Sequence, residues 1–359
     1  MLKKLDIYII KKFLGTFFFA ILLIISISVV FDVTERIDDF IEKEAPLSEI
    51  VFDYYLNFIP YFANLFSSLF TFIAVIFFTS KMAYDTEIIA ILSSGVSFHR
   101  FMWPYFLSAL IIALFSFTLS SYIIPPANKV RLDFAEKYLK NPYRNYNRNI
   151  HRQIEPGLYI FMENYNVTNS VGYKFSMERF ENGILKSKLI SDYIKWDEEN
   201  KKWKITNYFI RNINGLDEDY SLGKNIDTTL NMRPSDFSMR DNIVETMSLP
   251  KLNAFIDNQR MNGVENIESY LIEKYRRIAF PFSTFILTLI GVALSSRKVK
   301  GGVGLHIGIG LLISFGYILF MQISQQFAIN GNFNPLLAAW IPNIIFAFVA
   351  VYLYRSAPK

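Results

Sequence analysis

Side chains able to do chemistry are few and scattered in this sequence. The 359 residues contain no cysteine and only three histidines, His99, His151 and His306, which lie far apart in the chain. Without cysteine there are no disulfides, thiol nucleophiles or cysteine-bound metal centres. The phosphate-binding motif G-x-x-x-x-G-K-[ST] is absent, as are H-E-x-x-H and G-x-S-x-G. We therefore expect neither an enzyme nor a bound metal or cofactor.

Residues 80–97 carry the clearest local pattern in the chain. Asp85 or Thr86 is placed to cap a short helix, and Glu87 suits the positive charge at the N-terminal end of that helix. Gly95 is placed to end it in the left-handed conformation. The pattern predicts a short helix at about residues 85–95.

The apolar residues of this predicted helix, Ile88, Ile91 and Leu92, recur at helical spacing and share one face. Such a helix either lies on the membrane surface or fits a groove on a partner protein. Because the chain has no nucleotide-binding motif of its own, an external motor is an attractive partner.

Composition places this helix in a membrane protein. Hydrophobic residues make up 52% of the chain and charged residues 19%, yet the mean hydropathy of +0.24 is too low for a chain that is apolar throughout. A membrane-spanning helix needs about 20 mainly apolar residues. Six runs approach or reach that length: 13–33, 56–78, 101–124, 278–294, 303–324 and 336–354. Pro125 and Pro126 are expected to end the third run.

Lysine and arginine gather in loops that alternating spans would place on one side of the membrane. They are Lys3, Lys4, Lys11, Lys12, Lys81, Arg100, Arg297, Lys298, Lys300, Arg355 and Lys359. The loop after the first span is instead acidic, so the positive-inside rule places both termini in the cytoplasm. The formal charge of +5 thus reports topology, and we expect no nucleic-acid partner.

The polar insert between the third and fourth spans would then lie outside the cytoplasm. Its short alternating runs predict an antiparallel β domain over residues 127–248, between the helical regions 1–126 and 249–359. The expected strands are 158–165, 173–180, 184–196, 202–213 and 226–232. Apolar residues occupy both phases of several strands, which permits an apolar cleft as well as a core. The alternative is a cap that only stabilises the protein.

Two further features suggest binding or packing. Arg276 and Arg277 precede the fourth span at the outer membrane boundary, where they either snorkel to headgroups or bind an anionic lipid or lipid phosphate. Gly304 and Gly308 have the small-residue spacing that lets two helices approach closely, and we favour this packing role over ligand binding.

Residues 85–97, D-T-E-I-I-A-I-L-S-S-G-V-S, resemble the coupling-helix motif of the LptF/LptG family of lipopolysaccharide-export permeases. The resemblance extends over the chain: it includes the opening Leu5-Asp6-x-Tyr8-Ile9, the three-plus-three spans and residues 274–295 with Pro281 and Gly291. The opening segment and residues 301–310 are closer to LptG than to LptF. The resemblance implies an α-helical membrane protein with six transmembrane helices and an inserted extracytoplasmic antiparallel β-jellyroll.

The resemblance also implies partners in the bacterial inner membrane and periplasm. Family members pair with a paralogous permease subunit, bind a dimer of the ATPase LptB, and pass lipopolysaccharide through the jellyroll to LptC and LptA. Contact with the ATPase would fall on Asp85, Glu87, Ile88, Ala90, Ile91, Leu92 and Gly95. The candidate lipid-binding residues are Arg36, Lys129, Arg131, Arg276, Arg277, Phe315 and Phe320. The acidic first outer loop departs from members that carry lysines there for lipid phosphates.

Two other functions remain as alternatives. A membrane-anchored assembly scaffold would use the β domain to bind partner proteins and would lack a stable ATPase subunit. A secondary transporter driven by an ion gradient is disfavoured, because ionisable residues are almost absent from the middle of the spans.

Overall fold

The computed structural model describes residues 3–139, 148–237, 241–261, 267–297, 302–331 and 333–357. It contains two compact units, described here separately. The helical unit comprises Met1–Leu139, Val244–Leu252 and Glu268–Lys359, and the sheet unit comprises Lys140–Ile243 and Asn253–Ile267. Lys298, Lys300 and Lys359, which support the topology prediction, lie outside the described residues.

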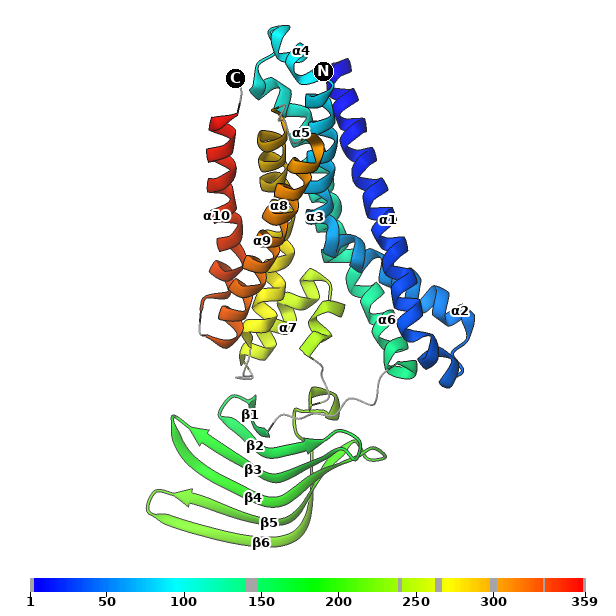
Figure 1. Ribbon diagram of the computed structural model, residues 1–359. Helices are drawn as coiled ribbons and strands as arrows, with labels where there is room; N and C mark the ends of the chain where they lie inside the picture. The colour runs from blue at the N-terminus through cyan, green and yellow to red at the C-terminus, as the bar shows by residue number, and fades with distance from the viewer. Residues whose placement is uncertain are drawn as a thin grey trace. The chain divides into compact units, whose positions relative to one another are not determined.

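Within its described residues, the helical unit contains six helices long and apolar enough to cross a membrane, as predicted (Figure 1). The first is α1 (Lys4–Glu42), and the last three are α8 (Ile267–Ser295), α9 (Gly302–Asn330) and α10 (Pro335–Ser356). The second and third are composite. The second consists of α2 (Leu47–Glu49), η1 (Ile50–Tyr55) and α3 (Leu56–Tyr84). The third consists of α5 (Phe98–Thr118), η2 (Leu119–Ile123) and α6 (Ile124–Tyr138).

The prediction that Pro125 and Pro126 end the third span is wrong, because the helix continues to Tyr138. Both prolines lie in the first turn of α6, directly after the π-helical segment η2. Proline disrupts a helix interior because it lacks an N–H and clashes with the carbonyl of an earlier residue. The first turn of a helix tolerates proline, and the π-helical segment η2 interrupts the α-helical hydrogen bonds directly before α6, so both prolines fit there.

Aromatic and small residues pack the spans against one another. The Phe78 ring lies 5.7 Å from that of Phe13 and 5.3 Å from that of Tyr105, which joins α3 to α1 and α5. Gly291 of α8 faces α3 so closely that a Cβ atom there would lie 2.9 Å from a methyl carbon of Val75. The small residue therefore sets the distance between these two helices.

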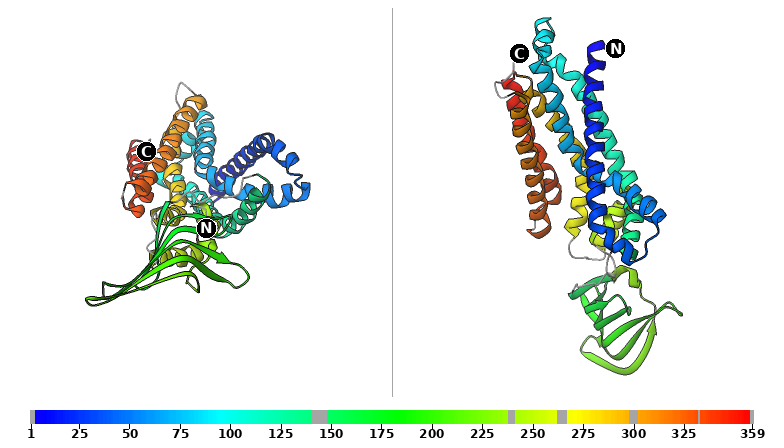
Figure 2. Two further views of the ribbon diagram at one scale, coloured as in Figure 1. Left: turned by 90° about the horizontal axis from the view of Figure 1, so that it is seen from below. Right: turned by 45° about the vertical axis from the view of Figure 1, so that its right-hand side comes forward.

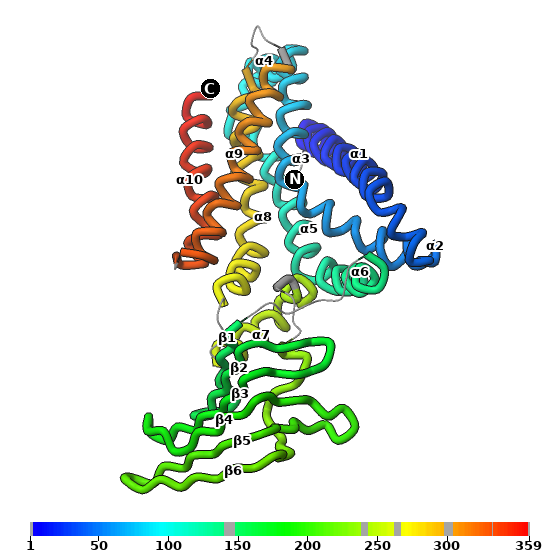
Figure 3. Tube along the Cα trace, turned by 60° about the horizontal axis from the view of Figure 1, so that its bottom comes forward, coloured from blue at the N-terminus to red at the C-terminus, as the bar shows by residue number. Residues whose placement is uncertain are grey.

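The sheet unit contains one six-stranded antiparallel sheet in which the strands follow chain order (Figure 3). They are β1 (Arg148–Glu155), β2 (Leu158–Asn166), β3 (Val171–Glu181), β4 (Ile184–Asp197), β5 (Lys202–Asn214) and β6 (Asp217–Thr228). The antiparallel insert is confirmed. The predicted strands missed β1, and the predicted strand 226–232 overlaps β6 only at its end.

Left-handed residues in β1, β3 and β5 interrupt the alternation of side chains along this sheet. Lys174 in β3 has φ of 50° and Asn207 in β5 has φ of 52°, and the strand pairing skips both positions. A residue in this conformation turns the following side chains to the other face and bends the strand. The interruption accounts for apolar residues in both phases of the sequence and for the curvature visible in Figure 1.

After the sheet, the chain returns through two 3-10 segments, η3 (Pro234–Phe237) and η4 (Asp241–Thr246). Helix α7 (Leu249–Met261) follows. The backbone N–H of Leu252 donates to the carbonyl of Ser248 at 2.8 Å, which begins the helical hydrogen-bond series.

Candidate functional site

The predicted short helix is present as α4 (Glu87–Ser93). Its N-cap is Thr86, whose φ of 64° is left-handed and whose side chain makes no capping hydrogen bond. Gly95 has φ of 85°, so the helix ends in the left-handed conformation as predicted. Helix α4 lies at the end of the helical unit where α1 begins and α10 ends (Figure 1).

The apolar face of α4 packs onto the protein itself. Ile88 is 1% exposed and belongs to a core cluster with Ile9, Phe13 and Phe98, and Ile91 and Leu92 pack partly buried against that cluster. Burying one isoleucine side chain contributes about 1.5–3 kcal/mol. The apolar face therefore holds α4 in place and leaves the opposite face for other contacts.

The opposite face of α4 is mixed in character. Ile89 is 55% exposed, and Asp85, Ala90, Ser93 and Gly95 are also exposed. Glu87 is half-buried and accepts a hydrogen bond from the Tyr8 hydroxyl of α1 at 3.0 Å. Of the predicted coupling residues, Asp85, Glu87, Ala90 and Gly95 are thus at the surface and Ile88 is beneath it.

At the opposite end of the helical unit, Arg277 is an internal residue. Its side chain is 4% exposed, and its Nε donates to the Glu273 carboxylate at 2.8 Å. Its two terminal nitrogens donate to the carbonyls of Met247 at 2.6 Å and Val244 at 2.9 Å. Protein acceptors thus occupy the Arg277 guanidinium, and the lipid-phosphate role of Arg277 stays a prediction.

Arg276 and Arg131 belong to a half-buried polar cluster near the same end. Arg276 also pairs with Glu273, while Arg131 of α6 lies over the Tyr61 ring at 5.1 Å, and the Nε of Arg131 is buried with no hydrogen-bond partner in the described structure. Burial, followed by the negative charge of Glu273, raises the pKa of Glu245. Two arginines and two glutamates thus gather here, and Glu273 already takes up part of the positive charge.

The other two basic candidates differ in exposure. Lys129 is exposed on α6. Arg36 is half-buried on α1, donates to Asp32 at 3.0 Å, and lies 5.9 Å from the centre of the Tyr54 ring. An arginine already paired within its own helix retains less free charge for a ligand than Lys129 does.

The candidate residues on α9 are directed away from the core. Phe315 is 54% exposed and Phe320 is half-buried. A Cβ atom added at Gly304 or Gly308 would meet nothing within 4 Å, whereas one at Gly310 would lie 2.3 Å from a methyl carbon of Ile76. Gly310 therefore packs within the chain, and Gly304 and Gly308 leave an open strip on α9.

One face of the sheet is apolar and only partly filled. Trp203 is fully buried there, stacks edge-on against Phe237, and donates its indole N–H to the carbonyl of Met232 at 3.0 Å. Further along, Met177 and Ile210 extend the same apolar row and remain partly buried. The two ends of this face therefore differ: one is closed by a core and the other retains accessible apolar surface.

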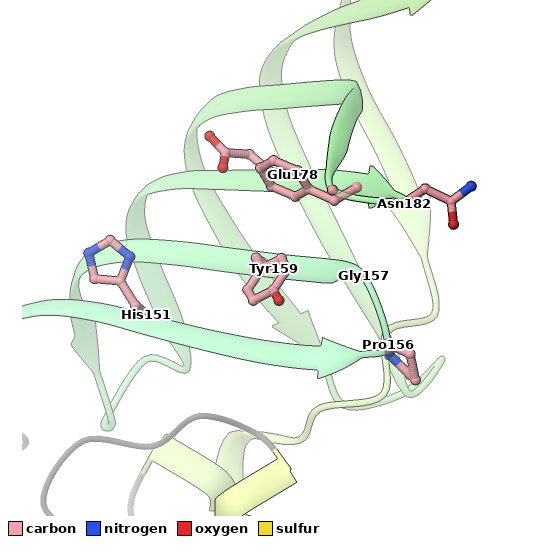
Figure 4. A pocket seen from close by; sticks show the side chains of 8 residues that line it. His151, Pro156, Gly157, Tyr159, Glu178 and Asn182 are labelled. Atoms are coloured by element: carbon pink, nitrogen blue, oxygen red, sulfur yellow. The ribbon is translucent and has the colours of Figure 1, made fainter.

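The opposite face of the sheet has a depression lined by His151, Tyr159, Glu178 and Asn182, among others (Figure 4). The Glu178 carboxylate is paired with Lys188 at 2.7 Å, so that side chain is not free to act as a base. Among the described residues no group of three or more acidic, histidine or cysteine side chains is placed to hold a metal ion.

The sequence did not reveal the contacts that Asp6, Tyr8 and Arg100 make around the predicted coupling helix, where Tyr8 contacts Glu87. The available signal was Asp6, because an acidic side chain in a helix at a membrane requires a partner. That partner, Arg100, lies 94 residues further along the chain, so no local spacing reveals the pair.

Comparison with known proteins agrees with this architecture. No curated protein matches the chain. The family model described as lipopolysaccharide export system permease LptF/LptG matches residues 7–356, which include all six spans and the sheet. The proteins of this family are non-catalytic, multi-pass inner-membrane components of a lipopolysaccharide export system that contains a partner permease and further Lpt proteins. Because the match covers nearly the entire sequence, the chain belongs to the LptF/LptG family of lipopolysaccharide export permeases.

Proposed function

We propose that this chain is one of two paralogous permease subunits in an ATP-driven exporter that takes lipopolysaccharide from the inner membrane and passes it to the periplasmic bridge proteins LptC and LptA. Both termini and α4 would be cytoplasmic, and the sheet would be periplasmic. The observation that carries the proposal is α4: its apolar face is fixed in the core, and Glu87, Ile89 and Ala90 remain available to the LptB ATPase dimer.

An external energy source is physically required for this task. Removing an acyl chain from the bilayer costs about 0.8 kcal/mol for every CH₂ group that water reaches. Several acyl chains therefore need both a protected apolar path and work done on the lipid. Exposed Phe18, Phe19 and Phe315 of α1 and α9 would contribute apolar walls between the two permease subunits, and the open row of the sheet would continue the path.

Photo-crosslinking inside the sheet tests the lipid path. A crosslinker at Ile210, on the apolar face, is expected to capture lipopolysaccharide in reconstituted complexes when ATP is present. The matched control is Ile190, a similarly apolar residue of β4 that is 45% exposed and lies on the other face, since its neighbour Leu189 pairs with Ile210. Equal capture at both positions, or capture without ATP, would contradict transport through the sheet.

Purification of the intact protein separates transport from the scaffold alternative. A permease is expected to retain a stable ATPase subunit in mild detergent, whereas a scaffold would retain only proteins bound to the sheet.

The open strip on α9 predicts an effect on subunit pairing. Gly308→Leu is expected to lower the yield of the partner permease bound to this chain, because a leucine side chain would prevent close helix approach. The yield of the chain itself should not change, since nothing lies within 4 Å of that position.

Gly310→Leu is the matched control for Gly308→Leu. It should lower the yield of the chain itself, because overpacking against Ile76 costs about 1–3 kcal/mol. Normal partner binding by Gly308→Leu would show that this strip faces lipid.

A further inference from the structure

The first turn of α1 is attached to the chain on both sides of α4. Asp6 is 1% exposed and accepts two hydrogen bonds from the Arg100 guanidinium, both at 2.7 Å. Arg100 lies in the first turn of α5, five residues beyond Gly95. On the other side, Tyr8 donates to Glu87, the first residue of α4, at 3.0 Å. The two contacts therefore bracket the short helix.

Apolar packing joins the same elements. Ile9 and Phe13 of α1 are fully buried in the cluster that also contains Ile88 of α4 and Phe98 of α5. Close-packed interiors are nearly incompressible, so a displacement of one member moves its neighbours. The inner end of α1, α4 and the start of α5 thus form one packed body.

The Asp6–Arg100 ion pair is buried on one side only, since Asp6 is 1% exposed and the Arg100 side chain is 36% exposed. An ion pair with one solvent-accessible partner adds little to stability, about 0–1 kcal/mol. What a bidentate arginine–carboxylate pair adds is a defined geometry. Asp6 and Arg100 therefore set the position of α1 relative to the exit from α4.

Helix α1 extends this connection to the other end of the unit. It is continuous for 39 residues, which corresponds to roughly 60 Å, and Figure 2 shows it along the length of the helical unit. None of residues 22–39 is buried. At the outer end, Phe40 enters an aromatic cluster with Tyr54, Tyr55 and Phe134. The helix is thus held firmly at its two ends and lightly between them.

We propose that Asp6 and Tyr8 are positioning residues that make α1 move together with α4, so that displacement of α4 by the ATPase is carried along α1 to the outer end of the permease. This proposal rests on the proposed function, because it requires an ATPase that acts on α4. It adds two residues, and one element, to the coupling path beyond α4 itself.

Distance measurement between spin labels tests the joint movement directly. The chain has no cysteine, so labels at Lys11→Cys and Ser94→Cys would be unique in it. Both positions are exposed. In the full complex the label distance is expected to be the same in the nucleotide-free and ATP-trapped states. In the Asp6→Asn, Tyr8→Phe double variant it should shift or broaden on trapping. The proposal would be overturned if the label distance changed on trapping in the complex with both contacts intact. It would also be overturned if the label distance did not change on trapping in the double variant.

Lipid release by Tyr8→Phe provides a second test that leaves the Asp6–Arg100 ion pair intact. The variant loses one hydroxyl group, and lipid released per ATP hydrolysed is expected to fall by about fivefold or more, the lower range of typical coupling effects. Tyr352→Phe is the matched control, because Tyr352 is 71% exposed on α10. A purely structural role for Tyr8 would lower the yield of complex and leave this ratio unchanged.

The two tests separate this proposal from the proposed function. If the unmodified complex releases lipid and Tyr8→Phe keeps its ratio, the role of Tyr8 is wrong and the exporter stands. If the unmodified complex releases no lipid with ATP, the exporter is wrong, and the label distances still decide whether α1 and α4 move together.

Discussion

Glu87→Lys is expected to reduce ATP-driven release of lipopolysaccharide strongly while the chain still folds and inserts. The variant keeps the apolar face of α4, because Ile88 remains in the core and Glu87 is only half-buried. It reverses the charge at the start of α4 and removes the acceptor for the Tyr8 hydroxyl. Juxtaposed like charges at an interface cost several kcal/mol, so release should fall by about tenfold or more. The measurement is lipid released per ATP hydrolysed in reconstituted vesicles.

Glu87→Gln is the matched control for this variant. Glutamine keeps an oxygen acceptor for Tyr8 and loses only the negative charge, so an intermediate ratio would assign separate roles to the charge and to the hydrogen bond. Unchanged lipid release by Glu87→Lys would remove Glu87 from the mechanism.

Arg277→Ala is expected to destabilise the helical unit by about 2 kcal/mol or more, because two backbone carbonyls lose their donor and Glu273 keeps only one of its two arginine partners. The Glu273 carboxylate would lose a hydrogen bond, and the carbonyls of Val244 and Met247 would lose their donors. Thermal unfolding in detergent measures the change.

Arg276→Ala is the control for Arg277, since it shares Glu273 but its side chain is 34% exposed. Its effect on stability should be smaller, because water can replace part of its interaction. Normal stability of Arg277→Ala combined with loss of lipid release would contradict the structural role and return Arg277 to the lipid site.

The sequence by itself was sufficient for the features that depend on neighbouring residues. Apolar runs of about 20 residues identify six spans, because the bilayer imposes that length on any helix that crosses it. Gly95 ends α4 because glycine, which has no Cβ atom, adopts the left-handed conformation of a helix end without steric cost. The same local view failed at Pro125, where the preceding π-helical turn changes what proline does to the helix.

Only the tertiary structure decided which polar and apolar groups are free. Arg276 and Arg277 are adjacent residues of the same type in the sequence. In the structure the Arg276 side chain is about one-third exposed, whereas Arg277 is buried and donates to the carbonyls of Val244 and Met247. Likewise, Ile88 was expected at a partner surface and belongs to the core with Ile9. Sequence periodicity specifies which side chains share a face, but packing of residues far apart in the chain determines what that face contacts.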